Sequence, residues 1–293
     1  MKTKLFLLFL LTSLLVSAQN EIWKKDLKKE LYQVGWIKQT SDGNIIASGA
    51  KGLLAMNNNT GEILWHNKEL KAVDKNTFLN IDGLPFFYVE YAPVVGKVRG
   101  IILNSSNGDI VFDTKDKGYR IKDYTLLQDK GIILFELLDN KKQKLMNFDL
   151  VKSQLNWIID LGEVGNIFKK LAGSSFINHG PFFTSPNNLI IGIKDKVFAI
   201  NFSNGEIVWK HKTKKKVNAL VYSEKNNNLY VGIKKSSKLL VLNPDNGTDI
   251  TPGKLKLRGE LIDVTSNSNG DLILVETEGF NIINPETNLF KWK

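Results

Sequence analysis

Cysteine is absent from the 293 residues, so the chain can form no disulfide, no thiolate metal site and no thiol nucleophile. Histidine is scarce: the 3 present (His66, His179 and His211) fall in separate segments and leave little material for a zinc or iron site. The sequence also lacks a Gly-x-Ser-x-Gly elbow, a His-Glu-x-x-His pair and a Gly-Lys-Ser/Thr phosphate loop. These absences remove the commonest catalytic and metal-binding motifs.

Long hydrophobic runs are missing except at the start of the chain. Lys2 and Lys4 precede the apolar run 5–16, and the small residues at 16–18 form a cleavage pattern. We predict a signal peptide over 1–18, a mature chain from Gln19 and an exported, soluble, monomeric protein, either periplasmic or extracellular. An uncleaved N-terminal anchor is the alternative. Without a cysteine there can be no lipoprotein anchor after the signal.

What the sequence does contain is one repeated phrase: an apolar strand, a polar corner and a second strand that ends on an aromatic residue. Clear examples are "LLAMNNNTGEILWHNKE" at 53–69, "IILNSSNGDIVFDTK" at 101–115 and "VFAINFSNGEIVWKHKT" at 197–213. The corner begins six times along the chain, at Asn57, Asn104, Asp149, Asn201, Asn243 and Asn284.

Each corner has a physical reason. Asn and Asp side chains begin turns, and the residue four positions later supplies a positive φ; it is Gly61, Gly108, Ser153, Gly205, Gly247 and Asn288 in the six copies. Four positions further on, an aromatic residue is expected to dock each sheet on the next, at Trp65, Phe112, Trp157, Trp209 and Trp292, with Thr251 in place of an aromatic in the fifth copy.

Four short antiparallel strands in each period of roughly 40–50 residues are typical of a β-propeller blade. In the fourth copy we expect strands at 169–177, 188–193, 196–201 and 206–210. The sequence therefore predicts an all-β chain whose residues 19–293 form a single propeller domain of six blades. A seventh aromatic strand, "EIWKKDL" with Trp23, is expected to lie against the last blade and close the ring. It leaves a fragmentary seventh blade as an alternative.

The repeat unit resembles the PQQ-like repeat of quinoprotein-type β-propellers, over essentially all of residues 21–293. The resemblance is strong in copies one and four and weak in copy five. Quinoprotein dehydrogenases of this family hold the quinone above a metal ion with acidic ligands, usually under a disulfide of adjacent cysteines. The absence of cysteine and the smaller number of blades favour no cofactor and no metal. The family also includes an outer-membrane assembly propeller that binds proteins without catalysing a reaction, which implies a binding or scaffold role here.

Two carboxylates are weak candidates for catalysis. Asp123 and Asp263 both fall on predicted innermost strands, where a propeller channel would bring them together as acid and base. The alternative function is therefore an enzyme acting on a glycan or small metabolite at the channel. Solvated channel residues are the simpler interpretation.

Charge gives a more informative pattern, with 40 Lys and Arg against 30 Asp and Glu. By the expected strands, most basic residues fall on the connections at one face of the blades. Only Lys130, Lys152 and Lys225 fall on the opposite face, which carries many acidic residues. Such a surface attracts anions in a salt-sensitive way. The candidate partner-binding lysines are Lys24, Lys25, Lys210, Lys212, Lys214, Lys215, Lys216, Lys234 and Lys235; an even spread of lysines over all solvated loops is the alternative.

One segment departs from the repeat. The stretch "LAGSSFINHGPFFTSPNN" at 171–188 is longer than its counterparts, and we interpret it as a loop whose Phe182 and Phe183 contact a partner or cap a blade. The aromatic stretch at 84–95 fits a buried strand instead. The sequence as a whole predicts an exported, non-enzymatic propeller that binds a protein or an anionic envelope component and no nucleic acid.

Overall fold

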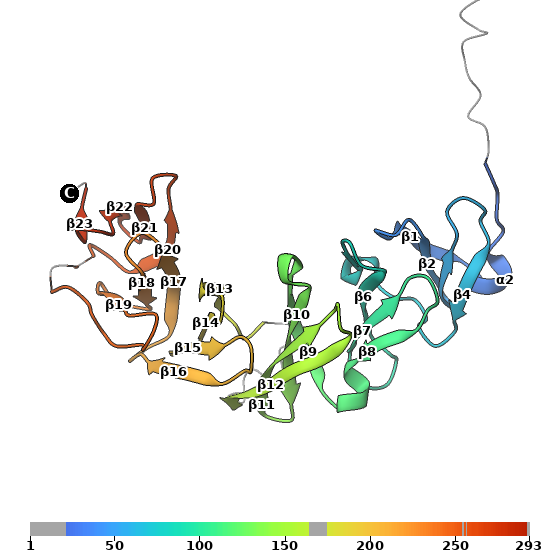
Figure 1. Ribbon diagram of the computed structural model, residues 1–293, viewed down its shortest axis with the longest axis horizontal. Helices are drawn as coiled ribbons and strands as arrows, with labels where there is room; N and C mark the ends of the chain where they lie inside the picture. The colour runs from blue at the N-terminus through green and yellow to red at the C-terminus, as the bar shows by residue number, and fades with distance from the viewer. Residues whose placement is uncertain (1–21, 164–174, 254, 256, 292–293) are drawn as a thin grey trace, which may run out of the picture. The chain divides into compact units, whose positions relative to one another are not determined.

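The computed structural model describes residues 22–163, 175–253, 255 and 257–291, and almost all of their regular structure is β (Figure 1). The strands form six antiparallel sheets, five with four strands and one with three. The predicted β-propeller class and its six blades are confirmed. No helix in the described part of the chain is long and apolar enough to cross a membrane. The predicted signal peptide and Trp292 lie outside the described residues.

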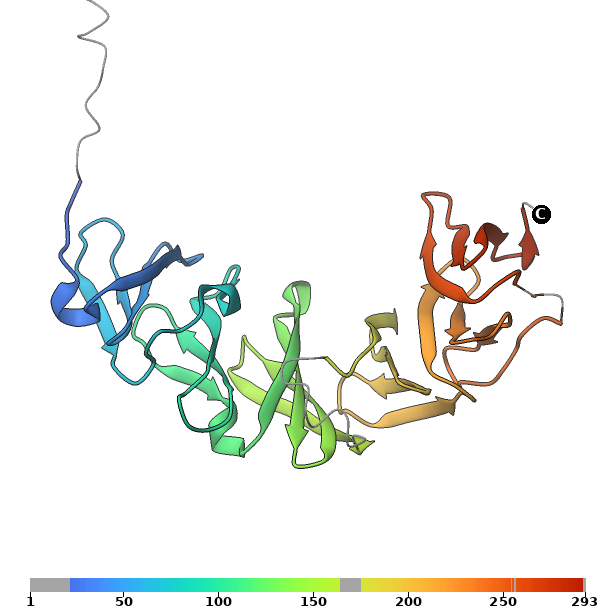
Figure 2. The same ribbon diagram turned by 180° about the vertical axis from the view of Figure 1, so that it is seen from behind.

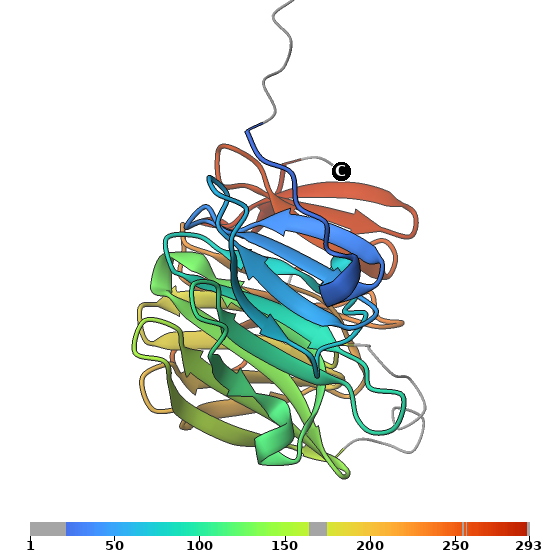
Figure 3. The ribbon, with the colours of Figure 1, turned by 90° about the vertical axis from the view of Figure 1, so that its right-hand side faces the viewer.

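The chain divides into two compact units, Met1–Asp113 and Thr114–Lys293. The first contains a short helix α2 (Lys28–Leu31), which lies beside the first sheet (Figure 3), and the 3₁₀ turn η1 (Lys75–Thr77). Sheet 1 consists of β1 (Val34–Gln39), β2 (Ile45–Gly49), β3 (Gly52–Met56) and β4 (Ile63–Asn67). Sheet 2 consists of β5 (Leu79–Ile81), β6 (Phe86–Tyr91), β7 (Arg99–Asn104) and β8 (Ile110–Asp113).

The second unit contains the other four sheets and the turns η2 (Thr114–Lys117) and η3 (Gln128–Lys130). Sheet 3 is β9 (Arg120–Leu127), β10 (Ile132–Asp139), β11 (Lys142–Asp149) and β12 (Gln154–Glu163). Sheet 4 is β13 (His179–Ser185), β14 (Asn188–Ile193), β15 (Lys196–Asn201) and β16 (Ile207–Lys212). Sheet 5 is β17 (Val217–Ser223), β18 (Asn228–Ile233) and β19 (Leu239–Leu242). Sheet 6 is β20 (Leu261–Ser266), β21 (Leu272–Glu276), β22 (Gly279–Asn284) and β23 (Leu289–Phe290). Figure 2 shows sheets 5 and 6 side by side from behind.

The middle strands of each sheet form the core. Every residue of β3 is buried, and so is every residue of β14 after its first, because both faces of these strands are covered. One face of β3 packs on sheet 2 and the other on α2 and the residues before it, whereas β14 lies between sheets 3 and 5. The expected buried strand within 84–95 is confirmed, since Phe87, Tyr88 and Val89 of β6 are fully buried. Outer strands such as β16 differ, with Trp209 buried between exposed neighbours.

In the described part of the chain, a β-bulge lies beside each docking aromatic of a fourth strand, Trp65, Phe112, Trp157 and Trp209. The register between the third and fourth strands shifts next to the pair Ala55–Trp65, and again next to Asn147–Trp157 and Ala199–Trp209. A bulge re-aims the side chain beside it. The repeat thus encodes a local irregularity that turns the aromatic ring out of its own sheet.

The corners receive these rings. Within the first unit, Trp65 Nε1 donates to the carbonyl of Ser105 at 2.8 Å; within the second, Trp157 Nε1 donates to Phe202 (2.7 Å) and Trp209 Nε1 to Pro244 (2.8 Å). Each acceptor directly follows the Asn that opens the corner. A Cβ on the corner glycine would lie 2.7 Å from Trp65 at Gly108, 2.8 Å from Trp157 at Gly205 and 2.5 Å from Trp209 at Gly247. The corner glycine therefore allows both the positive φ and the close approach of the ring; we call the space above it the corner socket.

Three strand expectations are wrong. Residues 22–27 form no strand: Trp23 instead packs on Gly61 of sheet 1 and donates to the carbonyl of Asn58 at 2.7 Å, as the other tryptophans do at their corners. The first strand of sheet 4 is β13 (His179–Ser185) rather than 169–177, so the expected loop at 171–188 is largely a strand within its described part. Sheet 5 lacks its fourth strand, because Pro252 and Gly253 follow a single bridge between Leu242 and Asp249.

Candidate functional site

The two ends of each sheet carry different charges. We call the end with the connections between second and third strands, and between successive sheets, the basic end; the connections between first and second, and third and fourth strands, form the acidic end. In the first unit the basic-end connections carry exposed lysines (Lys51, Lys68, Lys71, Lys75 and Lys97), whereas the acidic-end connections carry Asp42, Glu62, Asp82 and Asp109 and no lysine or arginine in their described residues 40–44, 57–62, 82–85 and 105–109.

The second unit shows the same separation. Its basic end carries the exposed lysines Lys115, Lys117, Lys141, Lys214, Lys215, Lys216, Lys234, Lys235 and Lys238. Its acidic end carries the acidic residues Asp129, Glu206, Glu224, Asp245 and Glu286, together with Lys130, Lys152 and Lys225. The strands observed therefore reproduce, within each unit, the division of charge expected from the sequence.

The three lysines of the acidic end are all engaged locally. Lys152 Nζ lies 3.2 Å from Asp149 Oδ2, and Lys225 Nζ lies 3.8 Å from Glu286 Oε2. Lys130 Nζ lies 4.6 Å from the ring centre of Phe183, a cation–π contact. Two of these lysines therefore pair with carboxylates of their own end, and the third lies on an aromatic ring.

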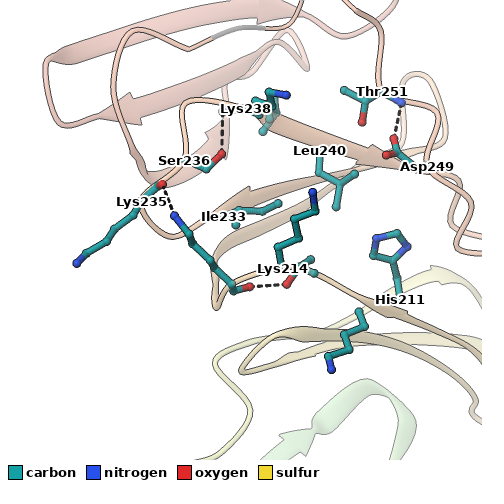
Figure 4. Close-up of a pocket in the computed structure, with 13 residues that line it drawn as sticks. His211, Lys214, Ile233, Lys235, Ser236, Lys238, Leu240, Asp249 and Thr251 are labelled. Carbon is teal, nitrogen blue, oxygen red and sulfur yellow. Dashed lines mark hydrogen bonds between the residues drawn. The ribbon is translucent and has the colours of Figure 1, made fainter.

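The lysines at 212–215 and 235–238 come together around one cavity of about 580 Å³ in the second unit (Figure 4). Five lysines line it: Lys212, Lys214, Lys215, Lys235 and Lys238. The side chain of Lys214 points toward Leu240, whereas that of Lys235 points away (Figure 4). The other lining residues are His211, Thr213, Ile233, Ser236, Leu239, Leu240, Asp249 and Thr251.

The cavity lies where sheet 5 departs from the repeat. In sheet 4, β16 covers the outer edge of β15 over most of its length. In sheet 5, the chain after β19 pairs only briefly: Ile250 N donates to Val241 O (2.9 Å), and Val241 N donates to the hydroxyl of Thr251 (2.8 Å). Thr251 stands where the other copies have an aromatic residue. Beside this irregular segment, Leu239 and Leu240 lie at the wall of the cavity.

Most polar groups of the cavity wall are held in place. Lys215 Nζ donates to the carbonyl of Lys235 at 3.0 Å, and His211 Nδ1 lies 3.0 Å from the carbonyl of Gly247. The hydrogen bonds from Thr251, and the nearby His211, hold the pKa of the Asp249 carboxyl below its ordinary value. For Lys212, Lys214 and Lys238 no side-chain partner is seen among the described residues.

The candidate catalytic carboxylates are in similar local positions. Asp123 Oδ1 accepts the amide of Tyr124 and Asp263 Oδ1 the amide of Val264, each at 2.8 Å and each at a bulge of the first strand of its sheet. Asp123 lies opposite Glu136 in the register, and Asp263 acts electrostatically on His179. No contact joins the two aspartates among the described residues, and their proposed acid–base role stays a prediction.

The sequence analysis did not single out the buried carboxylates Glu136 and Glu276. Glu136 accepts Ser175 Oγ (2.7 Å) and the amides of Phe176 (2.7 Å) and Ile177 (3.1 Å). Glu276 accepts the amides of Arg258 (2.6 Å) and Gly259 (3.0 Å). Burial raises the pKa of Glu136, although these donors act in the opposite direction. Glu136 holds the residues before β13 and Glu276 the residues before β20, which is a structural task.

The candidate aromatics of residues 171–188 do not form an exposed loop. Phe182 and Phe183 are half-buried on β13, and Phe183 packs edge-on against Phe202 at 4.9 Å between ring centres. Among the candidate lysines, Lys24 and Lys25 are exposed before α2. Lys210 is exposed on β16, with Nζ 5.9 Å from the ring centre of Phe198.

The described residues do not fit the quinone and metal that the resemblance implies for catalytic relatives. They contain no group of three or more His, Asp or Glu side chains that would hold a metal ion. Trp23, Trp65, Trp157 and Trp209 occupy corner sockets, so their ring faces are committed to protein contacts. We derive no chemistry through such a cofactor.

Comparison with known proteins gives similarity of fold alone. No family model and no curated protein matches the chain. Among solved structures, Sqt1 from Saccharomyces cerevisiae is similar with a TM-score of 0.47 and 14% identity, over 87% of this chain and 72% of that chain. BamB from Moraxella catarrhalis is similar with a TM-score of 0.40 and 15% identity, over 83% of this chain and 69% of that chain.

Proposed function

We propose that this chain is an exported binding module, built from PQQ-like repeats, that holds an anionic partner through the lysines of its basic ends. The partner is a protein with an acidic surface or an anionic envelope component. The separation of charge between the two ends of the sheets is the observation that carries the proposal. Lysines cluster where the connections are exposed, and the few on the acidic end are engaged by acidic or aromatic neighbours.

A non-enzymatic role is the better interpretation of the same residues. The buried carboxylates Glu136 and Glu276 hold backbone amides, and Asp123 and Asp263 each accept their neighbour's amide. Exposed lysines, by contrast, raise the local potential and draw anions from solution. Attraction of this kind weakens as salt is added, because the Debye length is about 8 Å at physiological ionic strength.

Binding to heparin, used as a model polyanion, tests the proposal. The variant Lys216→Gln/Lys234→Gln removes two exposed lysines of the basic end that do not line the cavity. The control Lys152→Gln/Lys225→Gln removes two positive charges from the acidic end. We expect the first variant to lose about fivefold in affinity at low salt, at about 0.5 kcal/mol for each exposed charge contact. The control is expected to retain affinity.

The difference in heparin affinity between the two variants decides the outcome. Equal losses would mean that heparin senses only net charge, and the proposed basic end would be wrong. Retention that survives high salt would also contradict an electrostatic surface. A pull-down from an envelope extract, washed first at low and then at high salt, would then identify the partner.

A further inference from the structure

The cavity beside β19 differs from the rest of the basic end because it combines charge with depth and an apolar wall. Its volume of about 580 Å³ falls within the range of about 300–1,000 Å³ typical of small-molecule sites. A second cavity of about 560 Å³, at the connection between β10 and β11, is lined by Asp139, Asn140, Lys141, Lys142, Lys144 and Glu163 and has no apolar side chain in its described lining. A concave site can enclose a ligand and remove it from water.

The lining residues define the chemistry of the ligand. Lys214 and Lys238 approach from separate connections, one before β17 and one before β19, so two positive charges face a common space. The hydroxyl of Ser236 adds a hydrogen-bonding group, whereas the hydroxyl of Thr213 and Nδ1 of His211 already contact backbone carbonyls. Ile233, Leu239 and Leu240 supply apolar surface. Asp249 is the one acidic residue in the described lining, and its carboxylate already accepts the amide of Thr251 at 2.9 Å.

The position of the cavity in the repeat is an independent observation. Sheets 1 and 4 have a complete fourth strand with a tryptophan, Trp65 or Trp209, that contacts the next corner. Sheet 5 replaces this arrangement with other contacts: Asn226 Nδ2 donates to Pro285 O (2.6 Å), and the hydroxyl of Tyr230 contacts Asn288 Oδ1 (2.9 Å). Docking to sheet 6 is therefore maintained without the strand and the ring. Beside β19 the chain makes a single bridge, Leu242 with Asp249, and the cavity is lined by Leu239, Leu240, Asp249 and Thr251 of this irregular region.

We propose that this cavity is a binding site for a small polyanion, a ligand with two or more carboxylate or phosphate groups on a short apolar body. The Nζ groups of Lys214 and Lys238 bind the charged groups, and the leucine wall contacts the body. The proposal deepens the proposed function, on which it rests, by assigning one specific anion site within the second unit. It does not require the remaining lysines to bind anything.

Titration calorimetry with two probes tests the site, with citrate for carboxylates and inorganic pyrophosphate for phosphates. The pocket variant is Lys214→Gln/Lys238→Gln, and the matched control is Lys28→Gln/Lys29→Gln, two exposed lysines of α2 in the other unit. We expect saturable binding of one or both probes, unchanged in the control and weakened at least about tenfold in the pocket variant, since the variant loses two charge-assisted contacts. Preference for one probe identifies the charged group that the site takes.

Other results would overturn the proposal. No saturable binding of either probe up to about 10 mM would exclude the site, since even a millimolar site would then be largely occupied. Equal weakening in the pocket variant and the control would show diffuse attraction instead. Thermal unfolding of both variants checks that the fold is intact; should the pocket variant unfold early, Lys214→Gln alone is titrated with the same expected direction. If neither citrate nor pyrophosphate binds but heparin affinity still depends on Lys216 and Lys234, the anion site is wrong and the proposed function is unaffected.

Discussion

The glycine at the fifth position of a corner has two separable duties. Gly247 has φ +69°, which an L side chain adopts at a cost of about 1–2 kcal/mol, and its missing Cβ makes room for the ring of Trp209. Gly118 has the same φ of +69°, but nothing lies within 4 Å of the point that a Cβ would occupy there. The pair therefore separates backbone strain from close packing.

We expect Gly247→Ala to lower the free energy of unfolding more than Gly118→Ala. Both carry the backbone cost, but only Gly247→Ala pushes a methyl group into Trp209, which adds about 1–3 kcal/mol by overpacking. Chemical denaturation of the two variants and the parent measures the difference. Equal losses would show that the ring moves aside freely and that the corner is not a fitted socket.

A second residue-scale prediction concerns pH. Burial lowers the pKa of His179, and Lys216 acts in the same direction, whereas Val217 and Asp263 oppose it. The unfolded chain then binds more protons than the folded chain below about pH 6.5, so the free energy of unfolding falls as pH drops through this range. The loss is complete once the pH is below the lowered folded pKa. We expect His179→Gln to flatten this dependence between about pH 7.5 and 5.5 in denaturant titrations. An unchanged slope would assign the dependence to other groups.

Elements repeat in this chain, but the contacts between them do not repeat in every copy. Four of the described tryptophans donate to the carbonyl of the residue that follows a corner Asn. Sheet 5 has no tryptophan donor of this kind among its described residues. The corresponding carbonyl, that of Pro285, is contacted instead by Tyr230 on β18, the second strand of sheet 5, and by Asn226 in the turn before β18. The corner carbonyl of sheet 6 thus accepts hydrogen bonds from a different element than in the other sheets, because a buried carbonyl needs a donor whichever strand provides it.

Because Tyr230 takes the place of a tryptophan donor in this contact, we expect Tyr230→Phe to destabilise the second unit. The change leaves the fully buried ring and removes the hydroxyl that contacts Asn288 and Asn226, so we expect a loss of about 1–2 kcal/mol. Tyr32→Phe, at an exposed tyrosine in the first unit, is the control and is expected to change stability little. Denaturant unfolding compares them. A neutral effect of Tyr230→Phe would mean that solvent or Asn226 alone satisfies these groups.

At the scale of the whole molecule, the main feature is the distribution of charge. The chain carries a formal net charge of +10 at pH 7, and the described lysines concentrate at one end of the sheets in both units. Long-range attraction depends on this distribution and on salt, and not on any one side chain. The anion pocket beside β19 adds a specific site to a general field.

The resemblance of the sequence repeat to that of quinoproteins gives a further whole-molecule prediction. Because the described residues offer no group of three metal ligands and the sequence has no cysteine, we expect added quinone and calcium to leave the melting temperature unchanged. Differential scanning fluorimetry with quinone, calcium or both measures this. An increase that requires both together, and that saturates, would contradict our assignment and indicate a site of the catalytic type.

How far the sequence could predict the molecule follows from the range of each interaction. The corners at Asn57, Asn104, Asn201 and Asn243 were predictable, since turn formation depends on neighbouring residues. The strands that flank the first three corners were predictable too, but the strand expected after Asn243 does not form. The first strand of sheet 4 was not predictable: the aromatic residues of 179–185 are compatible with an exposed loop or a half-buried strand. Their pairing with β14 decides between the two.

The candidate site divides in the same way. The lysine runs at 212–216 and 234–238 and the unusual Thr251 could be identified from the sequence, and the observed connections place those lysines at the basic end. That Lys214, Lys238 and Leu240 face one cavity could not be predicted, because they belong to segments that meet only when β17, β18 and β19 pair.

By itself, then, the sequence determined the β class, the number of sheets and the sign of the charge on their connections, because period, turn chemistry and ionisation are properties of short segments. Only the tertiary structure decided which tryptophan enters which corner, which carboxylates are buried and where a cavity opens. Those features depend on contacts between residues far apart in the chain, whose distances are fixed only by packing of complete sheets.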